Sequence, residues 1–245
     1  MLLNKSLSTT LIFTLGLMLA GCSTPEEKAQ KYYDKGMQLI ESDPNKAKLE
    51  FQNALQMKKD MPEAIFGLAL IAEKQSDWQA CFGLLNKVLD LKPAHLEATV
   101  KLGQLYLAAG DVEKAKKQAE DAVKIQADHV PTAMLLAAID LKERRFADAV
   151  TKANAVLKKD AQNADAYMIL ASERYSQQDI PAALTLLDKG IAVDAKNIVM
   201  YFFKISMLES SGNLAGVEST YQAMIKAIPE NEEVRGKFAE FLFKQ

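Results

Sequence analysis

The side chains that could carry out chemistry in this chain are few. Its 245 residues include two cysteines, Cys22 and Cys81, and two histidines, His95 and His129. Two cysteines exclude a disulfide scaffold and a zinc site built from four cysteines. The sequence has no HExxH motif and no Ser/His/Asp or Cys/His arrangement typical of a nucleophile, and its eleven glycines form no phosphate-binding loop. We therefore expect a protein that is not an enzyme and that holds neither a metal nor a cofactor.

The two histidines share one place in a longer pattern. They lie 34 residues apart, and the series continues with Asn163, Asn197 and Asn231. Such side chains accept hydrogen bonds from backbone amides, so the series predicts polar residues that cap the turn before a helix. A metal site shared by His95 and His129 is the alternative.

Cys22 lies directly after an apolar segment at the N-terminus. Lys5 precedes a run of 14 residues, 7–20, that is apolar apart from Ser, Thr and Gly. A helix that spans a bilayer needs about 20 residues, whereas the apolar core of a secretory signal is shorter. The segment ends Leu19-Ala20-Gly21-Cys22, and this sequence resembles the lipobox of bacterial lipoproteins.

The lipobox resemblance implies a lipid anchor and a cellular location. In that family the signal peptide, here residues 1–21, is removed, and the cysteine carries a diacylglycerol and usually an N-acyl chain, which together give durable anchoring. An ordinary signal peptide cut near Ala20, which would leave Cys22 as a free thiol, is the alternative. Ser23 stands where Asp would resemble an inner-membrane retention signal. We therefore expect the periplasmic face of the outer membrane, or the outer face of the cell membrane in a Gram-positive host.

The charge balance excludes one class of partner. Lys and Arg number 30 against 32 Asp and Glu, a formal net charge of −2. An electrostatic nucleic-acid binder carries a basic excess, so we expect no nucleic-acid partner.

The elements that position these residues repeat with a period of 34. Small residues recur in two columns, at Ala69, Gly103, Ala137 and Ala171, and again at Cys81, Ala115, Ala149 and Ala183. Small side chains at a fixed period indicate places where two helices approach closely. Cys81 lies in a column of alanines, so we expect it to be a buried structural thiol.

The period and its residues resemble the tetratricopeptide repeat (TPR), a pair of antiparallel helices. The segment Leu102-Gly103-Gln104-Leu105-Tyr106 matches the L-G-x-x-Y of that family, and Ala47-x-x-x-Phe51 follows its second-helix pattern. The resemblance implies an all-α, right-handed superhelical solenoid. Its six repeats would be 29–61, 62–95, 96–129, 130–163, 164–197 and 198–231, followed by one terminal helix over 232–245. Residues 22–28 would form the acylated anchor and a helix cap, since Thr24-Pro25-Glu26-Glu27 has the form of a capping box.

Other columns predict the surroundings of individual side chains. Asp77, Asp111, Asp179 and Asn213 precede the second helices and are expected to cap them, and Arg145 interrupts that series. Trp78, next in the sequence, is expected in the inter-helix core. A cluster of lysines at 114, 116, 117 and 124 indicates a solvated outer face.

Two charged residues replace the tyrosine of the L-G-x-x-Y motif. Asp140 and Arg174 occupy the column of Tyr106, one repeat apart. We expect them to pair across the interface between repeats and so to fix its register.

The TPR resemblance also implies a binding surface. Stacked repeats form a superhelix whose concave face is lined by first helices, and in the family the fifth position of each first helix points into that groove. Here the column reads Tyr33, Phe66, Val100, Met134, Met168 and Phe202, which is apolar throughout. It lacks the Lys and Asn that the chaperone-binding subfamily uses to clamp a peptide carboxylate. An amphipathic helix or an extended apolar peptide is therefore the expected ligand, and burial of this column by tight winding is the alternative.

The terminal helix has an apolar face of its own. Phe238, Phe241, Leu242 and Phe243 would leave it partly uncovered, which predicts docking, self-association or a continuing array. The combined interpretation is a lipid-anchored adaptor. It is similar to repeat lipoproteins of envelope assembly and exopolysaccharide export, including the PEP-CTERM-associated type. A pilotin for a type IV pilus secretin, a barrel-assembly lipoprotein, a regulator of a cell-wall synthase and a structural spacer are the alternatives.

Overall fold

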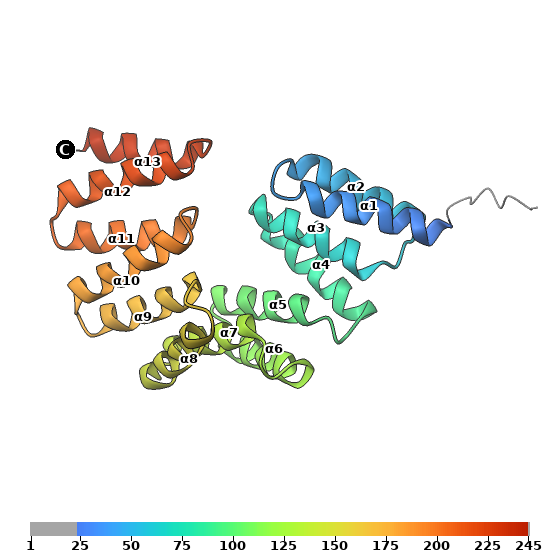
Figure 1. The fold of residues 1–245 in the computed structure, drawn as a ribbon, viewed down its shortest axis with the longest axis horizontal. Coiled ribbons are helices and arrows are strands. Elements are labelled where there is room, and N and C mark those ends of the chain that lie inside the picture. Colours follow the sequence, from blue (N-terminus) through green and yellow to red (C-terminus); the bar gives the residue numbers. More distant parts are fainter. Residues whose placement is uncertain (1–23, 245) are drawn as a thin grey trace, which may run out of the picture.

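A computed structural model describes residues 24–244, and this part of the chain is all helical, without a strand (Figure 1). The first helices of the successive pairs carry odd numbers: α1 (Pro25–Leu39), α3 (Pro62–Lys74), α5 (Leu96–Ala108), α7 (Val130–Lys142), α9 (Ala164–Ser176), α11 (Ile198–Ser210) and the unpaired α13 (Glu232–Phe243). The second helices carry even numbers: α2 (Pro44–Met57), α4 (Trp78–Leu91), α6 (Val112–Ile125), α8 (Phe146–Lys159), α10 (Ile180–Val193) and α12 (Leu214–Ala227).

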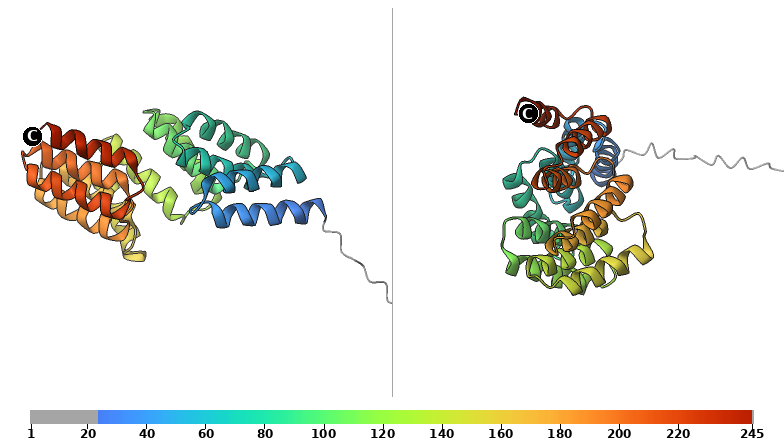
Figure 2. Two further views of the ribbon diagram at one scale, coloured as in Figure 1. Left: turned by 90° about the horizontal axis from the view of Figure 1, so that it is seen from above. Right: turned by 90° about the vertical axis from the view of Figure 1, so that its left-hand side faces the viewer.

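The helices follow one another along a curved path. Figure 1 shows this path running from α1–α4, through α5–α8, to α9–α13, and the two further views show the same succession of packed pairs (Figure 2). Each helix packs mainly against its neighbours in sequence, and α1, α5 and α9 also contact the nearest first helix, α3 or α7. The predicted all-α solenoid is therefore confirmed.

The helix starts are set by caps that the sequence predicts. Thr24 and Glu27 form the capping box, each side-chain oxygen accepting the other residue's backbone N–H at 3.1 Å. Asp77 accepts the N–H of Ala80 at 3.0 Å, and the other three members of its column cap α6, α10 and α12 in the same way. Arg145, by contrast, makes no capping hydrogen bond.

Five of the six described turns from a first to a second helix contain one left-handed residue; the turn between α1 and α2 has none. Five positions 34 residues apart have positive φ: Ser76 (56°), Gly110 (84°), Arg144 (61°), Gln178 (62°) and Gly212 (70°). A side chain at such a φ brings Cβ close to the following carbonyl oxygen, which costs about 1–2 kcal/mol unless the residue is glycine. Three of the five turns therefore carry backbone strain that the other two avoid.

The core is built on the two small-residue columns. Ala69, Ala137 and Ala171 have no exposed surface, and Cys81 is 1% exposed. The ring of Phe51 lies between α1 and α3, where a Cβ added to Gly36 or to Gly67 would come within 2.6 Å of it. The close approach of the helices thus requires small residues opposite the larger ones.

Trp78 is not the core residue that its column predicts. It is the first residue of α4 and is 54% exposed, and Leu214, in the same column, is 46% exposed. A residue at the first position of a second helix has the preceding turn on one side and open surface on the other. An indole is too large to be covered there, so the prediction for Trp78 was wrong.

The terminal helix is covered on one side. Phe241 is buried and Phe238 packs against the same cluster, whereas Leu242 is 47% and Phe243 93% exposed. An apolar surface therefore remains on α13, as predicted. The signal segment with its lipobox lies outside the described residues. Between residues 24 and 244, no helix is long and apolar enough to cross a bilayer.

The turn geometry generates the first prediction. Gly110→Ala should lower the free energy of unfolding by about 1–2 kcal/mol, because the new Cβ meets nothing within 4 Å and only the backbone is strained. Arg144→Gly should raise it by about 0.5–1 kcal/mol, since relief of strain exceeds the entropic cost of glycine. Urea unfolding of both variants measures the two effects, and equal signs would contradict the assignment of strain to these turns.

Candidate functional site on the first helices

The six side chains predicted to line the groove come from six different first helices, α1 to α11. Val100 and Met134 are 3% and 5% exposed, and the other four, Tyr33, Phe66, Met168 and Phe202, are half-buried. The winding of the array thus covers much of this column, and it does not form a continuous open stripe. What remains accessible is divided into separate hollows.

The central hollow lies across three first helices, α5, α7 and α9. Its volume is about 340 Å³, and its lining residues are Gln104, Leu107, Ala108, Met134, Leu135, Ala138, Asp165, Met168 and Ile169. The lining comes from the second half of α5, the first half and middle of α7 and the first half of α9, so the hollow crosses the helices diagonally. We call it the central hollow below. It brings together two of the predicted groove residues, Met134 and Met168.

The outer members of the column lie elsewhere and have partners of their own. The ring of Tyr33 packs 6.0 Å from Phe51, and Phe66 packs 4.9 Å from the ring of His95. Phe202 lines a second hollow between α11 and α13, together with Glu209, Glu233 and Lys237 among others. The six predicted residues therefore belong to at least two surfaces.

Asp165 is the one charged residue of the central hollow. Its pKa is raised, mainly because the surrounding protein reduces the hydration of its carboxylate and further because Asp194 adds negative charge. The residue is nevertheless exposed to solvent in the lining of the hollow, so this loss of hydration is partial. No hydrogen bond or ion pair holds this carboxylate within residues 24–244. Asp165 is not among the residues predicted from the sequence; its place one turn before Met168 on the same face of a helix was the available signal.

Cys81, His95 and His129 serve packing or local hydrogen bonding. Cys81 is buried and its thiol pKa is raised by that burial, which disfavours the reactive thiolate. Nδ1 of His95 accepts the N–H of Ala98 at 3.3 Å, whereas His129 contacts Thr132 at 2.9 Å without capping its helix. The predicted capping role holds for His95. Residues 24–244 contain no group of side chains suited to a metal.

A further apolar surface was missed because Trp78 was assigned to the core. Trp78 and Phe82, one turn apart on α4, line a hollow of about 500 Å³ with Leu105, Ala108 and Ala109 at the end of α5. Phe82 packs edge-on against Tyr106 at 5.4 Å. An aromatic pair spaced i, i+4 at the start of a second helix was the sequence signal for this surface.

The predicted pair of Asp140 and Arg174 does not form. Asp140 is 4% exposed, and its carboxylate accepts hydrogen bonds from Arg145 Nε at 2.9 Å and Nη2 at 2.5 Å and from Lys152 Nζ at 2.6 Å. Arg174 instead contacts Glu173 at 3.4 Å. Asp140 lies close to the end of α7, so the chain that turns into α8 brings Arg145 back over it.

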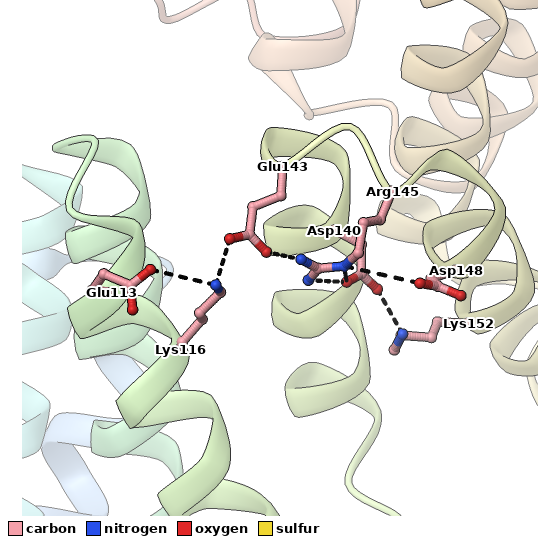
Figure 3. Close-up of polar contacts among 7 residues, drawn as sticks. All are labelled: Glu113, Lys116, Asp140, Glu143, Arg145, Asp148 and Lys152. Carbon is pink, nitrogen blue, oxygen red and sulfur yellow. Dashed lines mark hydrogen bonds and ion pairs between the residues drawn. The ribbon is translucent and has the colours of Figure 1, made fainter.

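The Asp140 contacts belong to a larger ion-pair network (Figure 3). Arg145 also contacts Glu143, which contacts Lys116 of α6, and Lys116 contacts Glu113 at 3.4 Å. The Lys116–Glu143 contact crosses from the third repeat to the fourth. The two departures from the repeat pattern, Asp140 and Arg145, thus explain each other, because the arginine that cannot cap α8 neutralises the buried aspartate.

Family models of the tetratricopeptide repeat match two overlapping segments, residues 72–139 and residues 134–197. Together they cover residues 72–197, half of the chain, and the chain belongs to the tetratricopeptide repeat family. The fold and family therefore define a protein-interaction scaffold. No curated protein matches the sequence.

Solved structures share the fold at low sequence identity. A tetratricopeptide repeat protein from Parabacteroides merdae is 12% identical with a TM-score of 0.71 over 87% of this chain and 84% of that one. PilF of Pseudomonas aeruginosa is 14% identical with a TM-score of 0.58, covering 90% of this chain and 99% of its own. PilW, a type IV pilus biogenesis factor, is also 14% identical, with a TM-score of 0.61 over 85% and 97% of the two chains. At these identities the similarity shows the fold alone.

The ion-pair network yields a prediction with an internal control. Asp140→Ala should lower the free energy of unfolding by about 2–3 kcal/mol, because Arg145 and Lys152 lose their shared partner at a buried position, although both can still turn toward solvent. Arg174→Ala, in the same column, should change it by less than about 0.5 kcal/mol. Denaturant unfolding measures both. Comparable losses in the two variants would support the predicted Asp140–Arg174 pair and contradict the pairing of Asp140 with Arg145 and Lys152.

His95 yields a prediction of pH dependence. Burial lowers its pKa below the ordinary value, so as the pH falls through about 6.5 the unfolded chain takes up a proton before the folded chain does. This group's contribution to stability is therefore present above that pH and declines below it. His95→Asn places here the residue found at 163, 197 and 231, which keeps a cap but does not titrate. The loss of stability between pH 7.5 and 5.5, measured in urea, should be smaller in this variant; an equal loss would exclude His95 as its source.

Proposed function

We propose that this protein is a non-catalytic scaffold, anchored by lipid on Cys22 at the periplasmic face of the outer membrane, that binds a partner protein through its first helices. The central hollow carries this proposal, because it is a concave, mainly apolar surface with a single charged group in a repeat family whose folds serve protein interaction. The Trp78 surface is a second place where a partner could be held.

The anchor rests on the lipobox, Leu19-Ala20-Gly21-Cys22, and on the start of the fold. Helix α1 begins at Pro25 with its capping box at Thr24, so only Ser23 and Thr24 separate Cys22 from the first helix. Acyl chains on Cys22 would therefore hold the first repeat next to the lipid headgroups, with no long linker between them.

A role in assembly of the cell envelope is supported by two relatives in fold. PilW is described as a type IV pilus biogenesis factor, and this chain covers nearly all of PilW and of PilF. A pilotin-type role for a pilus secretin and a role in exopolysaccharide export both fit a lipid-anchored repeat protein of this length. A regulator of a cell-wall synthase is a further candidate, and it would be distinguished by a change in the rate of the synthase.

Photo-crosslinking in native cell envelopes tests the proposal. A photoreactive residue at Leu107 or Met168, in the walls of the central hollow, should yield one dominant protein adduct, identified by mass spectrometry. Asn154, exposed on the second helix α8, is the matched control position and should give little or none of that adduct.

Two outcomes would contradict the proposal. Adducts that form equally at Asn154, or at no position, would exclude the central hollow as the binding surface. In the same cells Cys22→Ala should move the protein from the membrane fraction to the soluble periplasm; retention in the membrane would exclude the lipid anchor while leaving the crosslinking result intact.

A further inference from the structure

The central hollow combines apolar walls with one carboxylate. Leu107 of α5, Met134 of α7 and Met168 of α9 contribute apolar surface, and Asp165, on α9, is the one ionisable residue of the lining. A partner that filled this space with an apolar side chain would also bring its neighbouring groups up to Asp165. Whether a positive or a negative group of the partner is favoured there depends on whether Asp165 is already paired with a cation of this chain.

Asp165 differs in this respect from two carboxylates at the same position of other first helices, Glu63 and Glu233, which are paired with lysines. Glu63 pairs with Lys92 at 2.9 Å and Glu233 lies 3.7 Å from Lys237, whereas Glu97 lies beside His95, whose Nδ1 already accepts the N–H of Ala98. Asp165 has no such partner within the described part of the chain. The dipole of α9, in whose first turn Asp165 lies, favours its negative charge, but no cationic side chain of the described residues pairs with it.

The surroundings of Asp165 increase the effect of this missing partner. Reduced hydration and the nearby carboxylate of Asp194 both disfavour the ionised form and raise its pKa. A cation brought to this point by a ligand would offset both effects by attraction to the carboxylate, whereas an anion would add to the repulsion from Asp194. A charge-assisted hydrogen bond to a Lys or Arg side chain is the contact that such a carboxylate favours.

We propose that the segment bound in the central hollow is a basic amphipathic one, in which a Lys or Arg side chain binds Asp165 and an adjacent apolar side chain packs against Leu107, Met134 and Met168. This inference rests on the proposed function and adds the chemistry of the partner. It is the reverse of the carboxylate clamp of the chaperone-binding repeats, because here the acidic group belongs to the groove. Charge then selects among apolar segments that would otherwise fit equally.

The test uses two designed peptides and the chain from residue 22 onward with Cys22→Ser, which contains every helix that the structure describes. Each fluorescein-labelled peptide has leucine at i, i+3, i+4 and i+7, with lysine at the remaining positions in one and glutamate in the other. We expect the lysine peptide to bind about tenfold more tightly by fluorescence anisotropy, which is the effect of one charge-assisted contact. Asp165→Asn should remove most of that difference.

Glu120→Gln is the matched control, because it makes the same change of charge at an exposed site on the second helix α6. It should leave the affinity for the lysine peptide within twofold, and unchanged thermal midpoints would show that both variants are folded. Equal binding of the two peptides, failure of both to bind, or an equal loss in Asp165→Asn and Glu120→Gln would overturn the inference.

The groove itself is tested separately with Met168→Ser. Loss of both peptides in this variant, without discrimination between them in the parent, would reject the basic partner but retain the central hollow as a binding surface. Crosslinking from Leu107 and Met168 in cell envelopes decides the proposed function independently of either peptide.

Discussion

The structure depends on how closely neighbouring helices can approach. The alanines of the two small-residue columns lie fully buried where one helix crosses the next, and Gly36 and Gly67 leave room for the ring of Phe51. An additional methyl group at such a contact would push two helix backbones apart, and this would displace every later repeat. The small residues therefore recur every 34 positions because each repeat makes the same close helix contacts, and the curvature of the array follows from those contacts.

The same constraint explains how much the sequence could predict. Close contacts and helix caps depend on residue type at a fixed spacing, so the solenoid and most of its caps could be inferred from the columns. The exposure of Trp78 could not, because it depends on how much surface the preceding turn covers. The grouping of Met134, Met168 and Asp165 could not either, since it depends on the angle between first helices and on no single column.

Asp140 and Arg174 show a further limit of reasoning by column. Equivalent positions in adjacent repeats are in register along the sequence, but a side chain near the end of a helix lies closer to the turn that follows it. Arg145 and Lys152 reach Asp140 from within its own repeat, and Arg174 remains with Glu173. The buried Asp140 is paired with the cations nearest to it, and these come from the start and the second turn of the following helix, α8.

The position of the central hollow along the array has a consequence for its persistence. In a solenoid each repeat is stabilised mainly by its two neighbours, so the ends open and close more easily than the middle. The hollow is built from α5, α7 and α9, with two helical pairs before it and at least one after it along the array. Fraying of α13 or of the first repeat would therefore leave the hollow intact, and a partner held there would remain bound while the ends of the array fluctuate.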